Sequence, residues 1–316
     1  MLHEVPGKED ILLASDRIKP FIHRTAVLTS KAIDSIAGIQ IFFKCENFQK
    51  AGAFKARGAT NAVFSYSDTE LANGVATHSS GNHAAALSMA ASNRGIPAYI
   101  VMPSNSSKVK IAAVESYGGI ITFCEPTLMA REETLARVLS KENALEVHPY
   151  NNSRIIAGQA TACLELIEDS PELDVIMAPV GGGGLLSGTA LTSFFFSGHS
   201  KVIAAEPAGA NDAYQSFYQK KFIPSIDPQT IADGLRTSLG SITFPIILEK
   251  VSDILLAGEG DIVSAMKLIW ERMKIIVEPS SAVPLAALLN HKKDFRGLKV
   301  GIILSGGNVD LSDLPW

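Results

Sequence analysis

Short apolar runs rich in β-branched residues alternate along the chain with stretches of helical period. The runs predict buried strands, because they are continuous rather than alternating and are bounded by turn residues. The helical stretches predict helices that cover both faces of a sheet, so the chain is expected to be an α/β protein with open parallel sheets. The predicted strands are 39–43, 99–102, 120–123, 175–178, 202–205 and 300–304, and the clearest helices are 108–117, 155–168 and 261–273.

Three polar or glycine-rich turns directly follow predicted strands. Ser79-Ser80-Gly81-Asn82-His83 follows the run 74–77, Gly181-Gly182-Gly183-Gly184 follows 175–180, and Ser305-Gly306-Gly307-Asn308 follows 300–304. Open α/β sheets bind their ligands at the carboxyl ends of strands. The three turns therefore predict a cofactor crevice.

A single lysine, Lys55, stands among small residues in the segment Ala51-Gly52-Ala53-Phe54-Lys55-Ala56-Arg57-Gly58-Ala59. A lysine that attacks a carbonyl needs close backbone approach on both sides, and small neighbours permit it. Lys55 is therefore a candidate Schiff-base lysine. A solvated turn lysine is the plain alternative when this segment is considered alone.

The order of these segments predicts two domains. The chain of 316 residues is long enough for one large or two closely packed domains. A compact block of short strand-helix units ends near Pro149, whereas Lys55 precedes the block and the tetraglycine turn follows it. We therefore expect a small domain, 67–151, inserted into a large cofactor-binding domain formed by 1–66 and 152–316.

Charge and composition limit the kinds of partner that the protein could bind. A net charge of -4 with scattered basic residues argues against a nucleic-acid partner. No apolar run approaches the roughly 20 residues that a membrane helix needs, and the N-terminal residues lack the apolar core of a signal peptide. Cys45, Cys124 and Cys163 have no metal-ligand spacing and lie in apolar runs, so we expect buried, reduced thiols and a cytoplasmic location.

Together, the motifs resemble the fold-type II pyridoxal-phosphate enzymes, in the branch of serine racemases and serine/threonine dehydratases. That family has a tryptophan synthase β-like fold, with two open parallel-sheet domains and the cofactor between them. The resemblance spans nearly the whole chain and rests on Phe42-Phe43-Lys44-Cys45-Glu46-Asn47, the lysine segment, the three turns, Ala205-Glu206-Pro207, Ala232-Asp233-Gly234, Glu278-Pro279-Ser280 and Val309-Asp310-Leu311.

The resemblance implies roles around pyridoxal 5'-phosphate. Lys55 would bind the cofactor aldehyde and then act as the base at the substrate α-carbon. Amides of Gly181, Gly182, Gly183 and Gly184 would hold the phosphate, because a dianion needs convergent N–H donors. Ser305 would make a neutral hydrogen bond to the pyridine nitrogen, which favours elimination over full carbanion delocalisation. Asn82 would contact the ring hydroxyl and Phe54 would stack on the ring, although Phe54 could equally be a core residue.

The substrate side is implied in the same way. Ser80 matches the serine that, in racemases, faces the lysine across the cofactor plane and serves as the second acid or base, whereas many dehydratases carry alanine there. A loop serine that binds the substrate carboxylate is the alternative for Ser80. Arg131 matches a carboxylate-binding position, and a solvent-facing helix arginine is its alternative. Ser79, Asn82 and His83 complete the implied substrate contacts, with a structural role as the plainer interpretation of His83.

A divalent cation is also implied by the resemblance. Glu206, the carbonyl of Ala210 and Asp212 would supply hard oxygen ligands for Mg²⁺ or Ca²⁺, with water completing the shell. Acidic loop residues that are merely solvated are the alternative on spacing alone.

Several positions depart from the family pattern. Ala53 replaces a common serine, and Tyr150 stands where vertebrate racemases have asparagine. Ala85 stands where nucleotide-activated racemases have glutamine, so ATP activation is not favoured, although Lys50, Lys110, Tyr117 and Asn308 match other parts of that site. Trp316 ends the sequence soon after the serine-glycine turn, and feedback regulation by isoleucine through an added domain is not expected.

The expected function is a pyridoxal-phosphate serine racemase with L-serine/L-threonine dehydratase activity, acting on small β-hydroxy amino acids as a homodimer. The alternatives are a threo-3-hydroxyaspartate dehydratase (an ammonia-lyase), a catabolic threonine dehydratase, and a catalytically silent binding protein of the same fold. A nicotinamide-binding Rossmann enzyme is less favoured, because Gly181 to Gly184 lack the G-x-G-x-x-G spacing.

Overall fold

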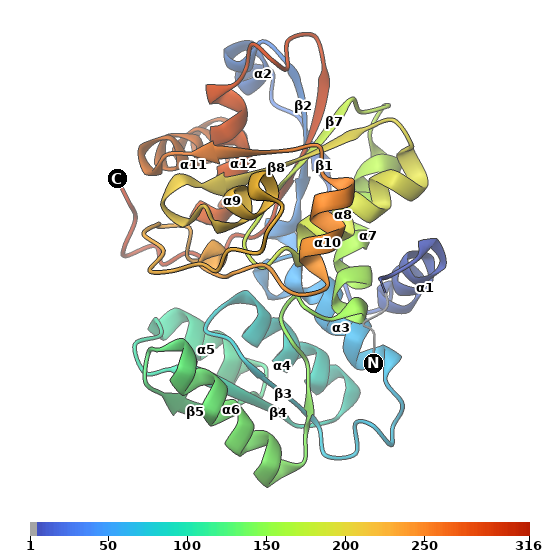
Figure 1. The fold of residues 1–316 in the computed structure, drawn as a ribbon, viewed down its shortest axis with the longest axis vertical. Helices are drawn as coiled ribbons and strands as arrows, with labels where there is room; N and C mark the ends of the chain where they lie inside the picture. Colours follow the sequence, from blue (N-terminus) through green and yellow to red (C-terminus); the bar gives the residue numbers. More distant parts are fainter. Residues whose placement is uncertain (1–4) are drawn as a thin grey trace.

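The computed structural model describes residues 5–316 and contains two sheets (Figure 1). The larger sheet has the order β1-β2-β10-β7-β8-β9. Every pair in this sheet is parallel except β1 with β2. Its strands are β1 (Val27–Leu28), β2 (Gln40–Cys45), β7 (Val175–Pro179), β8 (Lys201–Pro207), β9 (Asp253–Ala257) and β10 (Lys299–Leu304).

The smaller sheet is formed entirely within the middle of the chain and lies in the lower half of Figure 1. Its order is β5-β4-β3-β6, and all three pairs are parallel. Its strands are β3 (Val75–His78), β4 (Ala98–Pro103), β5 (Ile120–Cys124) and β6 (Leu145–Glu146).

Helices cover both faces of each sheet, as the strand-helix alternation predicts. One face of the larger sheet packs on α2 (Lys31–Ala37), α11 (Glu259–Met273) and α12 (Pro279–Asn290). Its other face packs on α7 (Ser153–Asp169), α8 (Gly184–Thr192), α9 (Asp212–Gln219) and α10 (Thr243–Lys250). In the smaller sheet, α3 (Lys55–Ser65), α4 (Asn82–Arg94) and α5 (Lys108–Ser116) share a core on one side, and α6 (Leu128–Glu142) packs on the other. Helix α1 (Lys8–Ile18) packs against α7.

Local caps explain where several helices begin and end. The side chain of Thr127 accepts a hydrogen bond from the amide of Ala130 at the start of α6, and Asn152 does the same for Arg154 and Ile155 at the start of α7. Helix α4 ends at Gly95, whose φ of 73° lies in the left-handed region that glycine adopts without strain. Among residues 5–316, no helix combines the length and apolar composition that crossing a bilayer requires.

The α/β prediction is confirmed, and each predicted strand is present within two residues at either end. The expectation for the cysteines is partly wrong. Cys45 and Cys163 are buried free thiols, but Cys124 is only half-buried. Cys124 ends β5, an edge strand that has a neighbour on one side only, so an apolar run there does not ensure burial.

Candidate active site

The predicted turns do lie at the carboxyl ends of strands, and the lysine segment is attached directly to one of them. The amide of Phe54 donates to the carbonyl of Ser305 over 2.9 Å, and Ala53 forms an isolated antiparallel bridge with Gly306. Ala53 has a φ of -161°, which is extended backbone that any residue adopts. These contacts place Lys55, the first residue of α3, beside the end of β10.

Lys55 points its amine at a backbone acceptor. Its Nζ donates to the carbonyl of Pro149 over 2.7 Å. Burial without a carboxylate partner lowers the pKa of Lys55 to about 8. A substantial fraction of this amine is therefore neutral near physiological pH, and a neutral amine is the nucleophilic form.

The tetraglycine turn is buried and carries free donors. The amides of Gly181, Gly182, Gly183 and Gly184 make no hydrogen bond within residues 5–316, although all four residues are buried at the start of α8. Buried amides are nearly always paired, so four unpaired ones in a row fit an anionic ligand such as a phosphate. This observation supports the fit of pyridoxal phosphate to the turn.

Close packing explains why this turn consists of glycines. A Cβ on Gly182 would lie 2.3 Å from the ring of Tyr150, and one on Gly184 would lie 2.9 Å from the Cβ of Tyr150. Gly183 has a φ of 87° and approaches Thr243. Tyr150 therefore lines the turn, at the position where the sequence departs from the vertebrate pattern.

A buried hydroxyl and an amide network lie at the turn after β10. Ser305 is 2% exposed, and its Oγ lies 3.1 Å from the Oγ of Ser281 in α12. Asn82 donates to the carboxyl of Glu278 over 2.8 Å and accepts from Asn308 over 2.9 Å. Burial raises the pKa of Glu278 to about 8, so this carboxyl is held in part as the neutral acid.

Two histidines, His83 and His148, lie near Lys55, and a third, His78, ends β3. His83 is buried, its Nε2 lies 3.0 Å from the carbonyl of Val147, and burial lowers its pKa to about 3. Burial lowers the pKa of His148 to about 4, and its Nδ1 accepts the amides of Tyr150 and Asn151. Burial also lowers the pKa of His78, which lies near Arg131. These contacts agree with a structural role for His83.

The remaining predicted site residues lie in the turn after β3, in α6 and just before α3. Ser79 and Ser80 are half-buried, and within the described chain the hydroxyl of Ser80 makes no hydrogen bond. Arg131, in the first turns of α6, forms no ion pair in residues 5–316, and its buried Nε has no partner. Phe54 is partly buried and packs on the core beneath the tetraglycine turn.

The three predicted metal ligands lie on one short stretch after β8. Glu206 accepts the amides of Ala213 and Tyr214, and Ala210 ends the 3₁₀ turn η4 (Ala208–Ala210). Both carboxylate oxygens of Asp212 are buried, and no group in the described residues makes a well-aligned hydrogen bond to them, although the Ser225 hydroxyl lies close enough to lower the pKa of Asp212. Burial raises the pKa of Glu206 to about 9 and that of Asp212 to about 6. Within residues 5–316 no cluster of three His, Cys, Asp or Glu side chains suits a metal, so a cation here would need the Ala210 carbonyl and water.

Sequence reasoning missed a buried ion network behind Lys55. Arg57 donates to Glu46 over 2.7 Å and to Glu165 over 2.7 Å, and Lys44 donates to Glu165 over 2.6 Å. Arg57, Lys44 and Glu46 are fully buried, and the four charges sum to zero. The network ties α3 to β2 and α7, and Lys44, which directly follows the predicted apolar strand 39–43, was the signal that could have revealed it.

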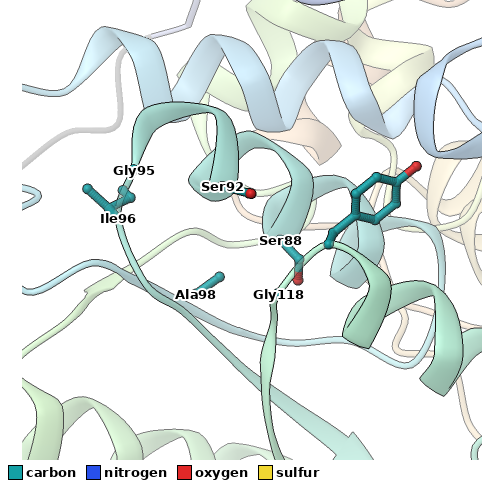
Figure 2. Close-up of a pocket in the computed structure, with 7 residues that line it drawn as sticks. Ser88, Ser92, Gly95, Ile96, Ala98 and Gly118 are labelled. Atoms are coloured by element: carbon teal, nitrogen blue, oxygen red, sulfur yellow. The ribbon is translucent and has the colours of Figure 1, made fainter.

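A separate pocket lies in the region of the smaller sheet (Figure 2). It measures about 260 Å³ and contains none of the predicted cofactor, substrate or metal residues, although Tyr117, which matches part of the nucleotide site of activated racemases, lines it. Its lining includes Ser88 and Ser92 of α4 and Gly118, which follows α5. Its lining has no charged side chain.

Comparison with known proteins identifies the family. The family model described as pyridoxal-phosphate dependent enzyme matches residues 18–306. The chain belongs to this family. It is 52% identical over 312 residues to a beta-hydroxyaspartate dehydratase of Paracoccus denitrificans, covering 99% of each chain. It is 50% identical over 313 residues to a serine racemase of Dictyostelium discoideum, covering 97% of this chain and 96% of the relative.

Solved structures agree with this assignment. The structure of maize serine racemase superposes with a TM-score of 0.95 at 45% identity, covering 98% of this chain and 95% of the maize chain. The fold is therefore that of a fold-type II enzyme, as the motifs predicted, and pyridoxal phosphate is the cofactor of the family.

Proposed function

We propose that this family member is a serine racemase that also dehydrates L-serine and L-threonine. The proposal is supported by the desolvated Lys55 amine next to the end of β10, the unpaired tetraglycine amides after β7 and the buried Ser305 hydroxyl after β10, with Ser80 in the turn after β3. The similarity to serine racemases supports it.

Each residue of the site would have a distinct role toward the cofactor or the substrate. When bound, pyridoxal phosphate supplies an electron sink that acidifies the α-proton of an amino acid. Gly181 to Gly184 would hold the phosphate, Asn82 would contact the ring hydroxyl, Phe54 would pack on the ring and Ser305 would meet the ring nitrogen. Lys55 would hold the cofactor at its aldehyde and would be the base that takes the α-proton on one face of the substrate. Ser80 would donate or take a proton on the opposite face.

Substrate binding would rest mainly on Arg131. The buried Nε of its guanidinium has no partner in the described residues, and a guanidinium suits a carboxylate. Ser79, Ser80, Asn82 and His83 form the rest of the pocket wall in this proposal. Closure of the small domain, 67–151, would exclude water from the site.

Ser80→Ala tests the racemase assignment. If Ser80 is the second acid or base, L-to-D conversion should fall by roughly 10²- to 10⁴-fold, because that is what a positioned proton donor contributes. L-serine dehydration should largely survive, since Lys55 still removes the α-proton, whereas D-serine dehydration should fall. Chiral chromatography and keto-acid assays measure both. Equal losses of L-serine elimination and racemisation would assign Ser80 to substrate binding and remove the racemase half of the proposal.

A 3-hydroxyaspartate dehydratase is the second candidate function. It is favoured by the 52% identity to the Paracoccus denitrificans enzyme, which slightly exceeds the identity to the Dictyostelium discoideum racemase. Assays of keto acid and enantiomer with serine, threonine and threo-3-hydroxyaspartate separate the candidates. Turnover of 3-hydroxyaspartate far above serine, without racemisation, would replace the first proposal by the second.

We also propose a divalent cation, Mg²⁺ or Ca²⁺, at Glu206, Asp212 and the carbonyl of Ala210. The unpaired, buried oxygens of Asp212 support it, because buried carboxylates are normally paired or metal-bound. We propose a homodimer from the resemblance. We propose a cytoplasmic location because the three cysteines are free thiols. ATP activation is not part of the proposal.

A further inference from the structure

The helix that begins at Lys55, α3, has no cap from its own segment. Its N-cap residue is Phe54, and the ring of Phe54 makes no capping hydrogen bond. A helix leaves its first amides without partners inside the helix, so each needs an acceptor from elsewhere. The amides of Ala56 and Arg57 donate to carbonyls three residues earlier in the chain, over 3.2 and 3.0 Å. The next amide, that of Gly58, has no such local acceptor within residues 5–316.

Gln159 of α7 supplies the missing acceptor from the helix that packs beside α3 (Figure 1). Its Oε1 accepts the amide of Gly58 over 3.1 Å, although the two residues are 101 positions apart in the chain. Gln159 is fully buried. A Cβ at Gly58 would lie 2.3 Å from the Nε2 and 2.6 Å from the Cδ of Gln159. The glycine of the lysine segment therefore makes room for the side chain that caps the helix.

The nitrogen of the Gln159 carboxamide has no partner. Nε2 is buried and makes no hydrogen bond within residues 5–316. The backbone N–H of Gly58 can only donate, so Oε1 must face it and Nε2 must point away. A buried donor without an acceptor is costly, and an apolar side chain of the same size would avoid that cost. Core packing alone therefore does not account for a glutamine at this position, whereas the need for an acceptor oxygen does.

We propose that Gln159 is a positioning residue, which caps the first turn of α3 and thereby fixes the Lys55 amine where it meets the cofactor aldehyde. This inference rests on the proposed assignment of Lys55 to the cofactor. Attachment joins the neutral lysine nitrogen to the aldehyde carbon and releases the aldehyde oxygen as water. Gly58 lies three residues after Lys55, so an unpaired Gly58 amide loosens the turn that carries the lysine. A misplacement of about 1 Å can slow such a reaction by about 10²-fold.

The titratable groups around this turn are common to all the variants below. His83 of α4 and His148, which precedes α7, both lie close enough to Lys55 for its charge to lower their pKa values. Within α3, the Arg57 guanidinium binds Glu46 and Glu165. Attachment rates are compared on their alkaline plateau, where the Lys55 amine is neutral in every variant, so that a change in its pKa does not enter the comparison.

The test separates covalent attachment from cofactor binding. Cofactor is removed from the full-length holoenzyme and pyridoxal phosphate is added back. Borohydride trapping with mass spectrometry gives the rate of attachment, and equilibrium dialysis gives the total bound cofactor. In Gln159→Met, which keeps the size of the side chain without a strong acceptor, the plateau rate of attachment should fall by roughly 10- to 100-fold. Total bound cofactor should stay near the wild-type level, because the tetraglycine turn would still hold the phosphate.

Matched variants make the result specific. Gln159→Glu keeps an acceptor oxygen at the same reach and should attach the cofactor at close to the wild-type rate. Cys163→Ala opens a hole farther along α7, where Cys163 is buried in the core, and should lower stability without slowing attachment. Wild-type attachment in Gln159→Met, slow attachment in Gln159→Glu or Cys163→Ala, or a loss of bound cofactor that matches the loss of attachment overturns the inference.

A measurement on the wild-type protein keeps the inference testable if Gln159→Met does not fold. In residue-resolved hydrogen exchange, the Gly58 amide should exchange as slowly as the amides farther into α3, because all of them are hydrogen-bonded. Rapid exchange at Gly58, as at a frayed helix end, shows that Gln159 does not cap the helix and overturns the inference.

Lys55→Ala separates this inference from the function beneath it. If Lys55→Ala forms no covalent adduct and Gln159→Met forms it at the wild-type rate, the role of Gln159 is wrong while the assignment of Lys55 stands. If Lys55→Ala still forms the adduct, another lysine holds the cofactor, and the assignment of Lys55 falls together with the inference.

Discussion

At the scale of single residues, the protonation of Lys55 controls how the cofactor can be attached. Its amine is held by the Pro149 carbonyl and burial lowers its pKa to about 8. Only the neutral amine attacks an aldehyde, so the rate of cofactor incorporation into apoprotein should rise with pH and level off above about 8, well below the value of about 10.4 for a free lysine. Borohydride trapping of the adduct at successive pH values measures this rate.

The same experiment has a direct control. Lys55→Ala should give no reducible covalent cofactor and no turnover, because the structure places Lys55 beside the Ser305 turn. A rate that keeps climbing above about pH 10, as for an ordinary lysine, would mean that the amine is not desolvated in solution. A covalent adduct in Lys55→Ala would mean that another lysine is used.

The raised pKa values of the Glu206 and Asp212 carboxyls predict that the free energy of unfolding depends on pH. Burial raises their pKa values to about 9 and about 6, so without a cation the folded protein holds protons that the unfolded chain releases near pH 4. The free energy of unfolding should therefore fall as pH rises from about 4 to about 9. Mg²⁺ replaces those protons, so the rise in Tm on adding Mg²⁺ should grow between about pH 6 and 9.

Scanning calorimetry with Mg²⁺ or EDTA checks this expectation. At a concentration near 100 Kd the cation should add about 2.7 kcal/mol of stability. Asp212→Asn should lose that gain while remaining folded. A Tm shift that is the same at both ends of the pH range, or unchanged in Asp212→Asn, would contradict a cation at these residues.

At the scale of elements, the contact between α3 and α7 depends on glycines. A Cβ on Gly158 would lie 2.6 Å from the Cα of Gly58 and 2.7 Å from the carbonyl of Arg57, both backbone atoms that cannot rotate away. Gly158→Ala should therefore destabilise the protein by about 1–3 kcal/mol, and it should also reduce activity by moving α3 and its Lys55. Urea denaturation and turnover measure the two effects.

Gly260 provides the matched control for Gly158. It lies within α11, and a Cβ there meets nothing within 4 Å. Gly260→Ala should stabilise the protein by up to about 1 kcal/mol, because alanine is the better helix former. If the two substitutions change stability equally, close helix packing at Gly158 is not what requires glycine.

At the scale of the whole molecule, a few polar contacts connect the two sheet regions. Lys110 of α5 pairs with Asp233 of η5 (Asp233–Leu235), and Asn82 of α4 binds Glu278. The Lys110 pair is partly exposed, so its loss should change stability by less than about 1 kcal/mol. Lys110→Met should nevertheless increase amide exchange in α5, because that helix loses a tie to the larger region.

Hydrogen-exchange mass spectrometry tests this prediction. Lys141→Met is the control, since Lys141 pairs with its neighbour Glu142 on the same helix. Unchanged exchange in α5, or an equal increase in β2 and β10, would show that the Lys110 pair does not hold the two regions together.

The sequence by itself determined six of the strands, β2, β4, β5, β7, β8 and β10, and the edge of the sheet on which the site lies. Apolar periodicity is local, and parallel strands bring their carboxyl ends to one edge, so the turns around Ser80, Gly181 and Ser305 could be assigned to a common crevice. The lysine segment and the family followed from the same local motifs. The elements that were not predicted are short. Helices α9 and α10 and strand β9 contain too few residues to show a clear hydrophobic period.

The tertiary structure alone decided which groups meet within that crevice. The amine of Lys55 reaches Pro149 across 94 residues, Arg57 reaches Glu165 across 108, and Gly306 meets Ser281 across 25. Such contacts depend on how helices pack over the sheet, where changes of less than an ångström separate a hydrogen bond from none. The pKa of Lys55, the unpaired amides of the tetraglycine turn and the half-buried state of Cys124 all follow from that packing, which no local pattern encodes.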